Sequence, residues 1–145
     1  MTDSRAPSVA LLYPGDRPTR DRADPAESRF VALFEAFAAA GVHAEPAVYH
    51  DDFADEVATQ LRRVSVVLVW CNPIEGGRRR DRLDAMLCEV AASGVTVSAH
   101  PDTILRLGTK DVLVETRDLP ARLDLGARVL EQHRGHSGIG VWRVE

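Results

Sequence analysis

The sequence predicts an α/β protein in which helices cover both faces of a parallel sheet. Two patterns indicate this fold class: short apolar runs, typical of strands buried on both faces, and longer segments with apolar residues at helical spacing. The two patterns alternate over residues 8–102. Strands that are joined through helices run parallel and their crossovers are right-handed, so this part is predicted to be Rossmann-like and doubly wound.

Four apolar runs are predicted to be the strands. The run SVALLY ends at Pro14 and Gly15. The run SVVLVW is the clearest strand because it is short and rich in β-branched residues, and it ends at Cys71. The predicted strands cover residues 8–13, 42–49, 65–70 and 95–98.

Three segments between these strands are predicted to be helices. Their apolar faces cover residues 30–37, 53–61 and 83–90. Gly41 is expected to stop the first helix, and Asp51 and Asp52 to cap the second. The arginines at 78–80 are expected to open the third helix, where they either serve an anionic ligand or face solvent. Residues 16–25 are expected to form a polar loop.

Composition limits the classes of partner. The chain has 145 residues and a formal net charge of -4, which disfavours nucleic acid because phosphate binding favours a basic surface. No apolar run is long enough to span a membrane or to form a signal peptide, so we expect a cytoplasmic protein. Lys110 is the only lysine among 18 basic side chains. Either this position needs a compact ammonium group that arginine cannot supply, or the single lysine is a coincidence.

Polar residues follow the predicted strands, at the edge where ligands of parallel sheets bind. Asp16, Arg17 and Arg20 follow the first strand, Asn72 the third and His100 the fourth. We predict these five side chains as substrate ligands, with the arginines suited to a carboxylate or phosphate. The alternative for the residues after the first strand is a solvated loop.

The carboxyl-terminal part has a different pattern. Residues 110–119 are predicted to be a helix that Thr109 caps, and residues 128–132 and 141–144 to be two strands. The loop RGHSGIG between the strands is rich in glycine, so the three segments make a hairpin. Glycines at a hairpin tip allow backbone N–H groups to approach phosphate oxygens.

The segments after the βαβ unit come in the order GTK, a helix, RVLEQ, a glycine-rich hairpin and VWRV. This order resembles the ATP-grasp superfamily of carboxylate–amine ligases, in particular a bacterial branch of it. The resemblance implies a pre-ATP-grasp domain at residues 1–103 and a truncated nucleotide-binding segment at 104–145. It also implies ATP and Mg²⁺ as cofactors.

The resemblance assigns nucleotide-binding roles in the second segment. Lys110 matches the family's first nucleotide-binding lysine, and Glu131 stands where the family has its second. Arg134 adds charge toward phosphate. The residues that match the phosphate-covering loop are Gly135, His136, Ser137, Gly138 and Gly140.

Two departures set the expected function. Glu131 would repel a triphosphate, and the subdomain that carries the family's magnesium ligands is missing. We therefore expect weak or vestigial ATP binding and no ligase activity by the chain alone. The alternative is an interaction module that docks on a partner subunit, or as a homodimer, to complete the site. A third reading is an enzyme that uses Asp16, Asn72 and His100 on a small anionic substrate.

Overall fold

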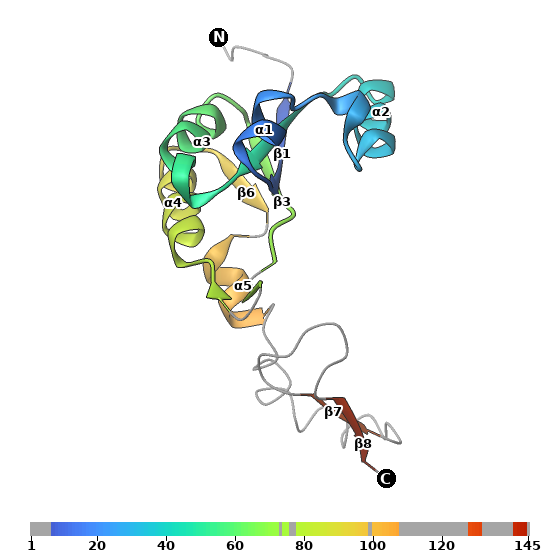
Figure 1. The fold of residues 1–145 in the computed structure, drawn as a ribbon, viewed down its shortest axis with the longest axis vertical. Coiled ribbons are helices and arrows are strands. Elements are labelled where there is room, and N and C mark those ends of the chain that lie inside the picture. Colours follow the sequence, from blue (N-terminus) through green and yellow to red (C-terminus); the bar gives the residue numbers. More distant parts are fainter. Residues whose placement is uncertain are drawn as a thin grey trace. The chain divides into compact units, whose positions relative to one another are not determined.

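The structure is a computed structural model that describes residues 7–72, 74–75, 78–98, 100–107, 128–131 and 141–144 (Figure 1). The chain forms two compact units, Met1–His100 and Pro101–Glu145.

The first unit contains a parallel four-stranded sheet with the strand order β2-β1-β3-β6. All four predicted strands are confirmed within a residue or two at their ends. The strands are β1 (Ser8–Pro14), β2 (His43–Tyr49), β3 (Val66–Val69) and β6 (Thr96–Ser98). β1 and β3 form the centre of the sheet because their residues are the most continuously apolar.

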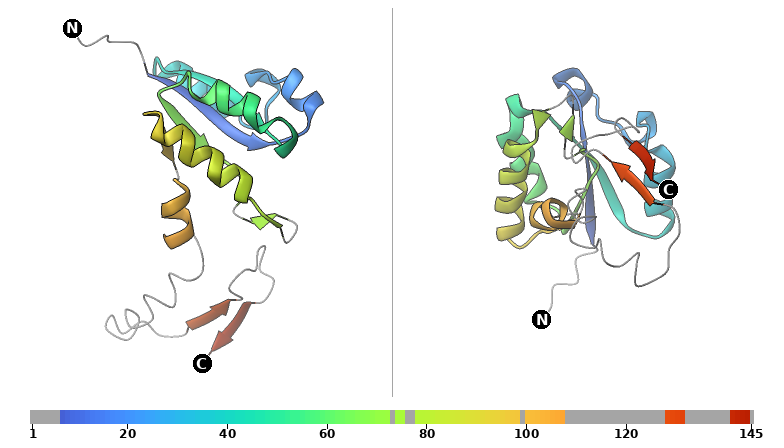
Figure 2. Two further views of the ribbon diagram at one scale, coloured as in Figure 1. Left: turned by 90° about the vertical axis from the view of Figure 1, so that its left-hand side faces the viewer. Right: turned by 90° about the horizontal axis from the view of Figure 1, so that it is seen from below.

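Helices cover both faces of the sheet, as predicted (Figure 2). α2 (Val31–Ala39) follows β1 and lies on one face. α3 (Ala54–Leu61) and α4 (Asp81–Ala92) lie on the other. The chain therefore leaves β1 toward one face and β2 and β3 toward the opposite face, as right-handed crossovers require for this strand order.

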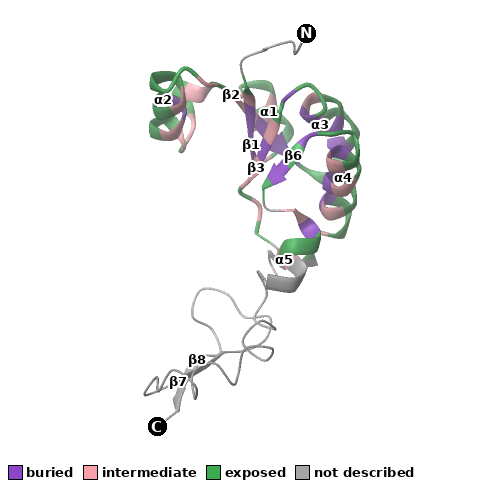
Figure 3. Cartoon of the chain, turned by 180° about the vertical axis from the view of Figure 1, so that it is seen from behind, coloured by how far each residue is buried: buried purple, intermediate pink, exposed green. Residues whose placement is uncertain are grey.

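Apolar side chains form a separate core on each face of the sheet. Figure 3 marks the buried residues in purple, and they include residues of β1, α3 and α4. The larger core includes Leu12, Leu61 and Leu87, which are fully buried between the sheet, α3 and α4. The smaller core joins Leu11 of β1 to Phe34, the one buried residue of α2. Alternate residues of β1 enter opposite cores, as the pleat of a strand dictates.

The predicted polar loop over residues 16–25 is wrong. The segment contains a short helix, α1 (Arg17–Asp21), and the 3-10 helix η1 (Pro25–Glu27) begins at its end. Asp16 caps α1, since its Oδ1 accepts the N–H of Thr19 at 2.9 Å. The hydroxyl of Thr19 donates to the same oxygen, and this bond, together with the N–H bond, lowers the pKa of Asp16. Capping and the proline at the start of α1 together favour the helical turn.

The predicted caps of the second helix are also wrong. Asp51 and Asp52 belong to a 3-10 helix, η2 (Asp51–Phe53), that precedes α3. His50 caps it instead, because Nδ1 of His50 accepts the N–H of Asp52 at 3.2 Å. A histidine cap is uncommon, which is why the aspartates are the natural prediction.

The arginines expected to open the third helix precede it. Ile74–Glu75 (β4) pairs with Arg78–Arg79 (β5) in an antiparallel ladder. Arg80 is the N-cap residue of α4, and it forms no side-chain capping hydrogen bond. Cationic side chains are unfavourable at the positive, amino-terminal end of a helix, which accounts for the later start of α4 at Asp81.

The second unit contains a helix that the sequence analysis missed, α5 (Pro101–Leu107). Proline at the first helical position and Asp102 in the first turn are the signals that mark it. β7 (Arg128–Glu131) pairs antiparallel with β8 (Val141–Val144), which confirms the two predicted strands. The helix predicted over residues 110–119 lies outside the described residues. None of the helices in the described ranges has the length and apolar character that a membrane crossing requires.

Candidate functional site at the carboxyl edge of the sheet

A small pocket lies at the carboxyl ends of the central strands. Because the helices after β1 and β3 go to opposite faces, the ends of these neighbouring strands flank the switch point at which doubly wound sheets bind ligands. The pocket has a volume of about 240 Å³, and we call it the strand-end pocket. Its lining residues are Pro14, Tyr49, His50, Asp51, Cys71, Asn72, Arg79, Arg80 and Leu83.

The rim of this pocket next to β2 is a hydrogen-bonded pair. The hydroxyl of Tyr49 donates to Oδ1 of Asp51 at 2.7 Å. Burial raises the pKa of Tyr49, and the bond to Asp51 raises it further. The phenol therefore keeps its proton and holds the Asp51 carboxylate in one orientation.

Another lining residue is Arg80, which ties α4 to the loop after β3. Nη1 of Arg80 donates to the carbonyl of Cys71, and Nε lies 2.9 Å from Oδ1 of Asp84. Nε and Nη2 of Arg80 are buried, and neither forms a hydrogen bond with the groups that the structure describes, so the contact of Nε with Asp84 is an ion pair. Burial raises the pKa of Asp84, and the charge of Arg80 opposes that shift.

Arg79 is the accessible cation of the strand-end pocket. Its side chain is 57% exposed and Nη2 lies 3.1 Å from Oδ1 of Asp81. Exposed ion pairs of this kind contribute little to stability, so an anion can replace Asp81 as the partner of Arg79. Since the Arg80 side chain forms no capping hydrogen bond, the backbone N–H groups of the first turn of α4 are suited to the same anion.

The structure brings only one of the five predicted substrate ligands to this pocket, Asn72. Asp16 is occupied as the cap of α1. Arg17 and Arg20 line a different depression. His100 is partly buried after β6 and is not among the described residues that line the strand-end pocket.

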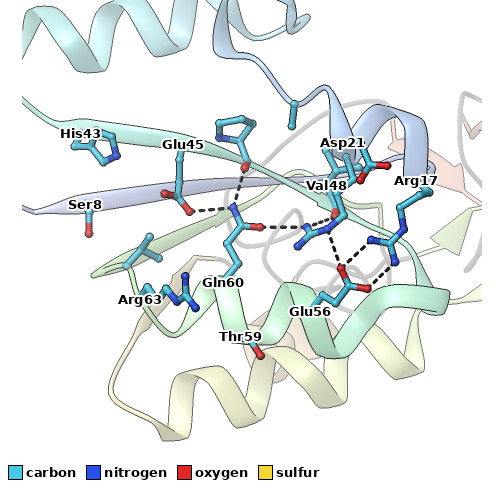
Figure 4. A pocket seen from close by; sticks show the side chains of 14 residues that line it. Ser8, Arg17, Asp21, His43, Glu45, Val48, Glu56, Thr59, Gln60 and Arg63 are labelled. Atoms are coloured by element: carbon cyan, nitrogen blue, oxygen red, sulfur yellow. Dashed lines mark hydrogen bonds and ion pairs between the residues drawn. The ribbon is translucent and has the colours of Figure 1, made fainter.

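The second depression is an open groove of about 950 Å³ beside β2, bounded by α1 and α3 (Figure 4). We call it the β2 groove. Nη1 and Nη2 of Arg17 donate to the two carboxylate oxygens of Glu56 at 2.8 and 2.6 Å. This pairing lowers the pKa of Glu56 and raises that of Arg17. The guanidinium groups of Arg17 and Arg20 also lie over the ring of Phe53, so protein groups already engage both arginines.

The sequence analysis did not select Tyr49, Asp51, Arg79 or Arg80 as site residues. Tyr49 and Asp51 stand at a strand end like the residues that were chosen. The available signal was therefore their position at the end of β2, where Tyr49 had been read only as part of a strand and Asp51 only as the cap of a helix. The arginines follow a glycine pair and precede a helix, a context that favours anion binding.

The predicted nucleotide ligands are mostly outside the described residues. Glu131 is the last residue of β7 and pairs with Val141 of β8. No group of His, Cys, Asp or Glu that could hold a metal ion is found among the side chains that the structure describes. The other predicted nucleotide ligands lie outside the described ranges; they are Lys110, Arg134, Gly135, His136, Ser137, Gly138 and Gly140.

Comparison of the chain with protein-family models, with curated proteins and with solved structures finds no match. The fold and the site therefore stand on the geometry of this chain: a doubly wound sheet with a polar pocket at its switch point.

Proposed function

We propose that the chain binds a small molecule with an oxyanion, a carboxylate or a phosphate, in the strand-end pocket. One observation carries the proposal: the ends of β1, β2 and β3 and the amino terminus of α4 contribute to the same pocket. This convergence is the arrangement by which open α/β sheets hold their ligands.

Three groups supply the expected anion contacts. Arg79 provides a guanidinium with room to exchange its partner, α4 provides backbone N–H groups, and Asn72 provides an exposed amide. The pocket volume of about 240 Å³ lies below the roughly 300–1,000 Å³ of sites for drug-sized ligands. The ligand is therefore a small metabolite and smaller than a nucleotide.

Two substitutions with opposite expected effects test the site. Arg79→Gln should weaken binding of inorganic phosphate or malonate about tenfold, which corresponds to about 1.4 kcal/mol. Asp81→Asn should strengthen binding, because it removes the carboxylate that competes for Arg79. Titrations followed by amide chemical shifts give the dissociation constants.

The matched control is Arg62→Gln, which removes a similar exposed ion pair, with Glu89, between α3 and α4. It should leave the affinity unchanged. Equal affinities for the wild type and Arg79→Gln, with no shift changes at Asp51 or Asn72, would contradict the proposal.

We propose, as a second candidate, a truncated ATP-grasp-like site in residues 104–145 with weak or vestigial ATP binding. The support is the antiparallel pairing of β7 with β8, which is the strand arrangement that the resemblance requires. An ATP analogue with Mg²⁺ should bind saturably to the full chain, and Lys110→Ala should abolish the binding. Binding that is identical in Lys110→Ala, or no binding to the wild type, would count against a working site.

The alternative within this second candidate is an interaction module. β7 and β8 form a two-stranded sheet in the described part of the second unit, and strand edges of this kind pair readily with other chains. A partner that completes the site should then bind the chain and raise its affinity for ATP. A chain that binds ATP fully by itself would exclude this alternative.

A further inference from the structure

We propose that the ligand of the strand-end pocket is a zwitterion, in which a short chain joins the oxyanion to an ammonium group that Asp51 binds. The inference rests on the proposed function and narrows its class of ligand. A simple oxyanion would leave one oriented charge of the pocket, the carboxylate of Asp51, without a partner.

The Asp51 carboxylate is held in place and is accessible. Asp51 is an exposed residue two positions after the end of β2, and it lines the pocket. Its Oδ1 accepts the hydroxyl of Tyr49 at 2.7 Å, and Tyr49 itself is only 7% exposed. A buried donor fixes one oxygen of the carboxylate while the rest of the group stays exposed. Asp51 is therefore a preorganised acceptor for a ligand.

Among the described residues, the Asp51 carboxylate has no cation as a partner. Every ion pair there uses a different carboxylate. Arg82 acts electrostatically on the phenol of Tyr49, but it is not within ion-pair distance of Asp51. A hydrogen bond from a neutral phenol leaves the charge in place, so Asp51 can attract a ligand cation.

The strand order separates this carboxylate from the anion-binding groups. β1 lies between β2 and β3, so the ends of β2 and β3 are about 10 Å apart at the usual spacing of strands. Pro14, the last residue of β1, also lines the pocket. Arg79 belongs to the hairpin that follows β3, and α4 begins two residues later. The segment after β2 thus supplies negative charge and the segment after β3 supplies positive charge.

A ligand that carries both charges suits this pocket better than a ligand with either charge alone. An anion that binds Arg79 in so small a pocket is repelled by Asp51, and a cation at Asp51 is repelled by Arg79. Complementary charge at both ends favours the zwitterion and discriminates against both simple ions. The volume of about 240 Å³ limits the chain between the two charged groups to a few atoms.

A matched pair of ligands tests the proposal. Propylphosphonate and aminopropylphosphonate differ only in the ammonium group. The wild-type chain should bind the aminated compound about tenfold more tightly, as one good ionic contact allows. Asp51→Asn should abolish this preference, and it should bind propylphosphonate at least as tightly as the wild type because the repulsion is gone. Titrations of the full chain followed by amide chemical shifts give the dissociation constants.

Two further variants sharpen the test. Asp52→Asn removes the neighbouring carboxylate, which is 85% exposed and is not among the residues that line the pocket. It makes the same change of charge and should keep the tenfold preference. Tyr49→Phe keeps the buried ring but frees the Asp51 carboxylate, so it should reduce the preference to about threefold.

The outcomes separate this inference from the proposed function. Equal affinities of the wild type for the two phosphonates, or a preference that Asp51→Asn leaves unchanged, would overturn the zwitterion while binding of propylphosphonate that depends on Arg79 still supports an oxyanion site. No binding of either phosphonate to the wild type would overturn the oxyanion site and the inference with it.

Discussion

Asp84→Ala is expected to lower the free energy of unfolding by about 3 kcal/mol, because it leaves the buried charge of Arg80 without its carboxylate. The Arg80 and Asp84 side chains are only 10% and 17% exposed, and Oδ1 of Asp84 is the anion next to Nε of Arg80. Urea unfolding monitored by circular dichroism gives the difference. The loss should extend to the strand-end pocket, since Arg80 also holds the carbonyl of Cys71.

The paired replacement Arg80→Met/Asp84→Leu is the control for this prediction. Apolar residues of similar volume remove both charges, so the double variant should recover most of the stability that Asp84→Ala loses. A double variant as unstable as the single one would show that packing, and not the uncompensated charge, causes the loss.

Gly15→Ala should cost about 3 kcal/mol, at the upper end of what overpacking causes. A Cβ at this position would lie 2.6 Å from Cγ1 of Val48 and 3.1 Å from Cγ2 of Thr19. Val48 is fully buried and β-branched, so its χ1 angle is restricted and the side chain cannot move aside freely. Thermal unfolding and urea unfolding both report the change.

Two further variants separate the steric cause from backbone conformation. Gly15→Ala/Val48→Ala creates room for the new methyl group, so its loss of stability should be smaller than the sum of the two single losses. Gly94→Ala places a Cβ in open space at a φ of +98° and should cost only about 1 kcal/mol. Additive effects of Gly15→Ala and Val48→Ala would refute the steric explanation.

The carboxyl-terminal hairpin is an example of strands that can be predicted from the periodicity of apolar residues. The alternation and length of apolar runs place β7 and β8 in the sequence, and the glycine-rich stretch between them predicts antiparallel pairing. The start of α1 shows the limit, because Asp16 and the following proline are local capping signals inside a segment whose composition is that of a loop.

The arginines after β1 show why the site differed from its prediction. Arg17 and Arg20 follow a strand of the sheet, where ligand-binding side chains are common, and the sequence around them does not show which groups pair with them. Their partners, Glu56 and Gln60, are on α3, some 40 residues further along the chain. Only the crossover that brings α3 next to α1 decides that these arginines bind protein groups.

The sequence by itself determined the four parallel strands and the helices between them, because burial on one or two faces imposes a local period on apolar residues. The tertiary structure alone decided which polar residues meet. The strand order β2-β1-β3-β6 places Tyr49, Asn72 and Arg79 around one pocket. These residues are distant in the sequence, and their proximity depends on the strand order, which leaves no periodic pattern in the chain.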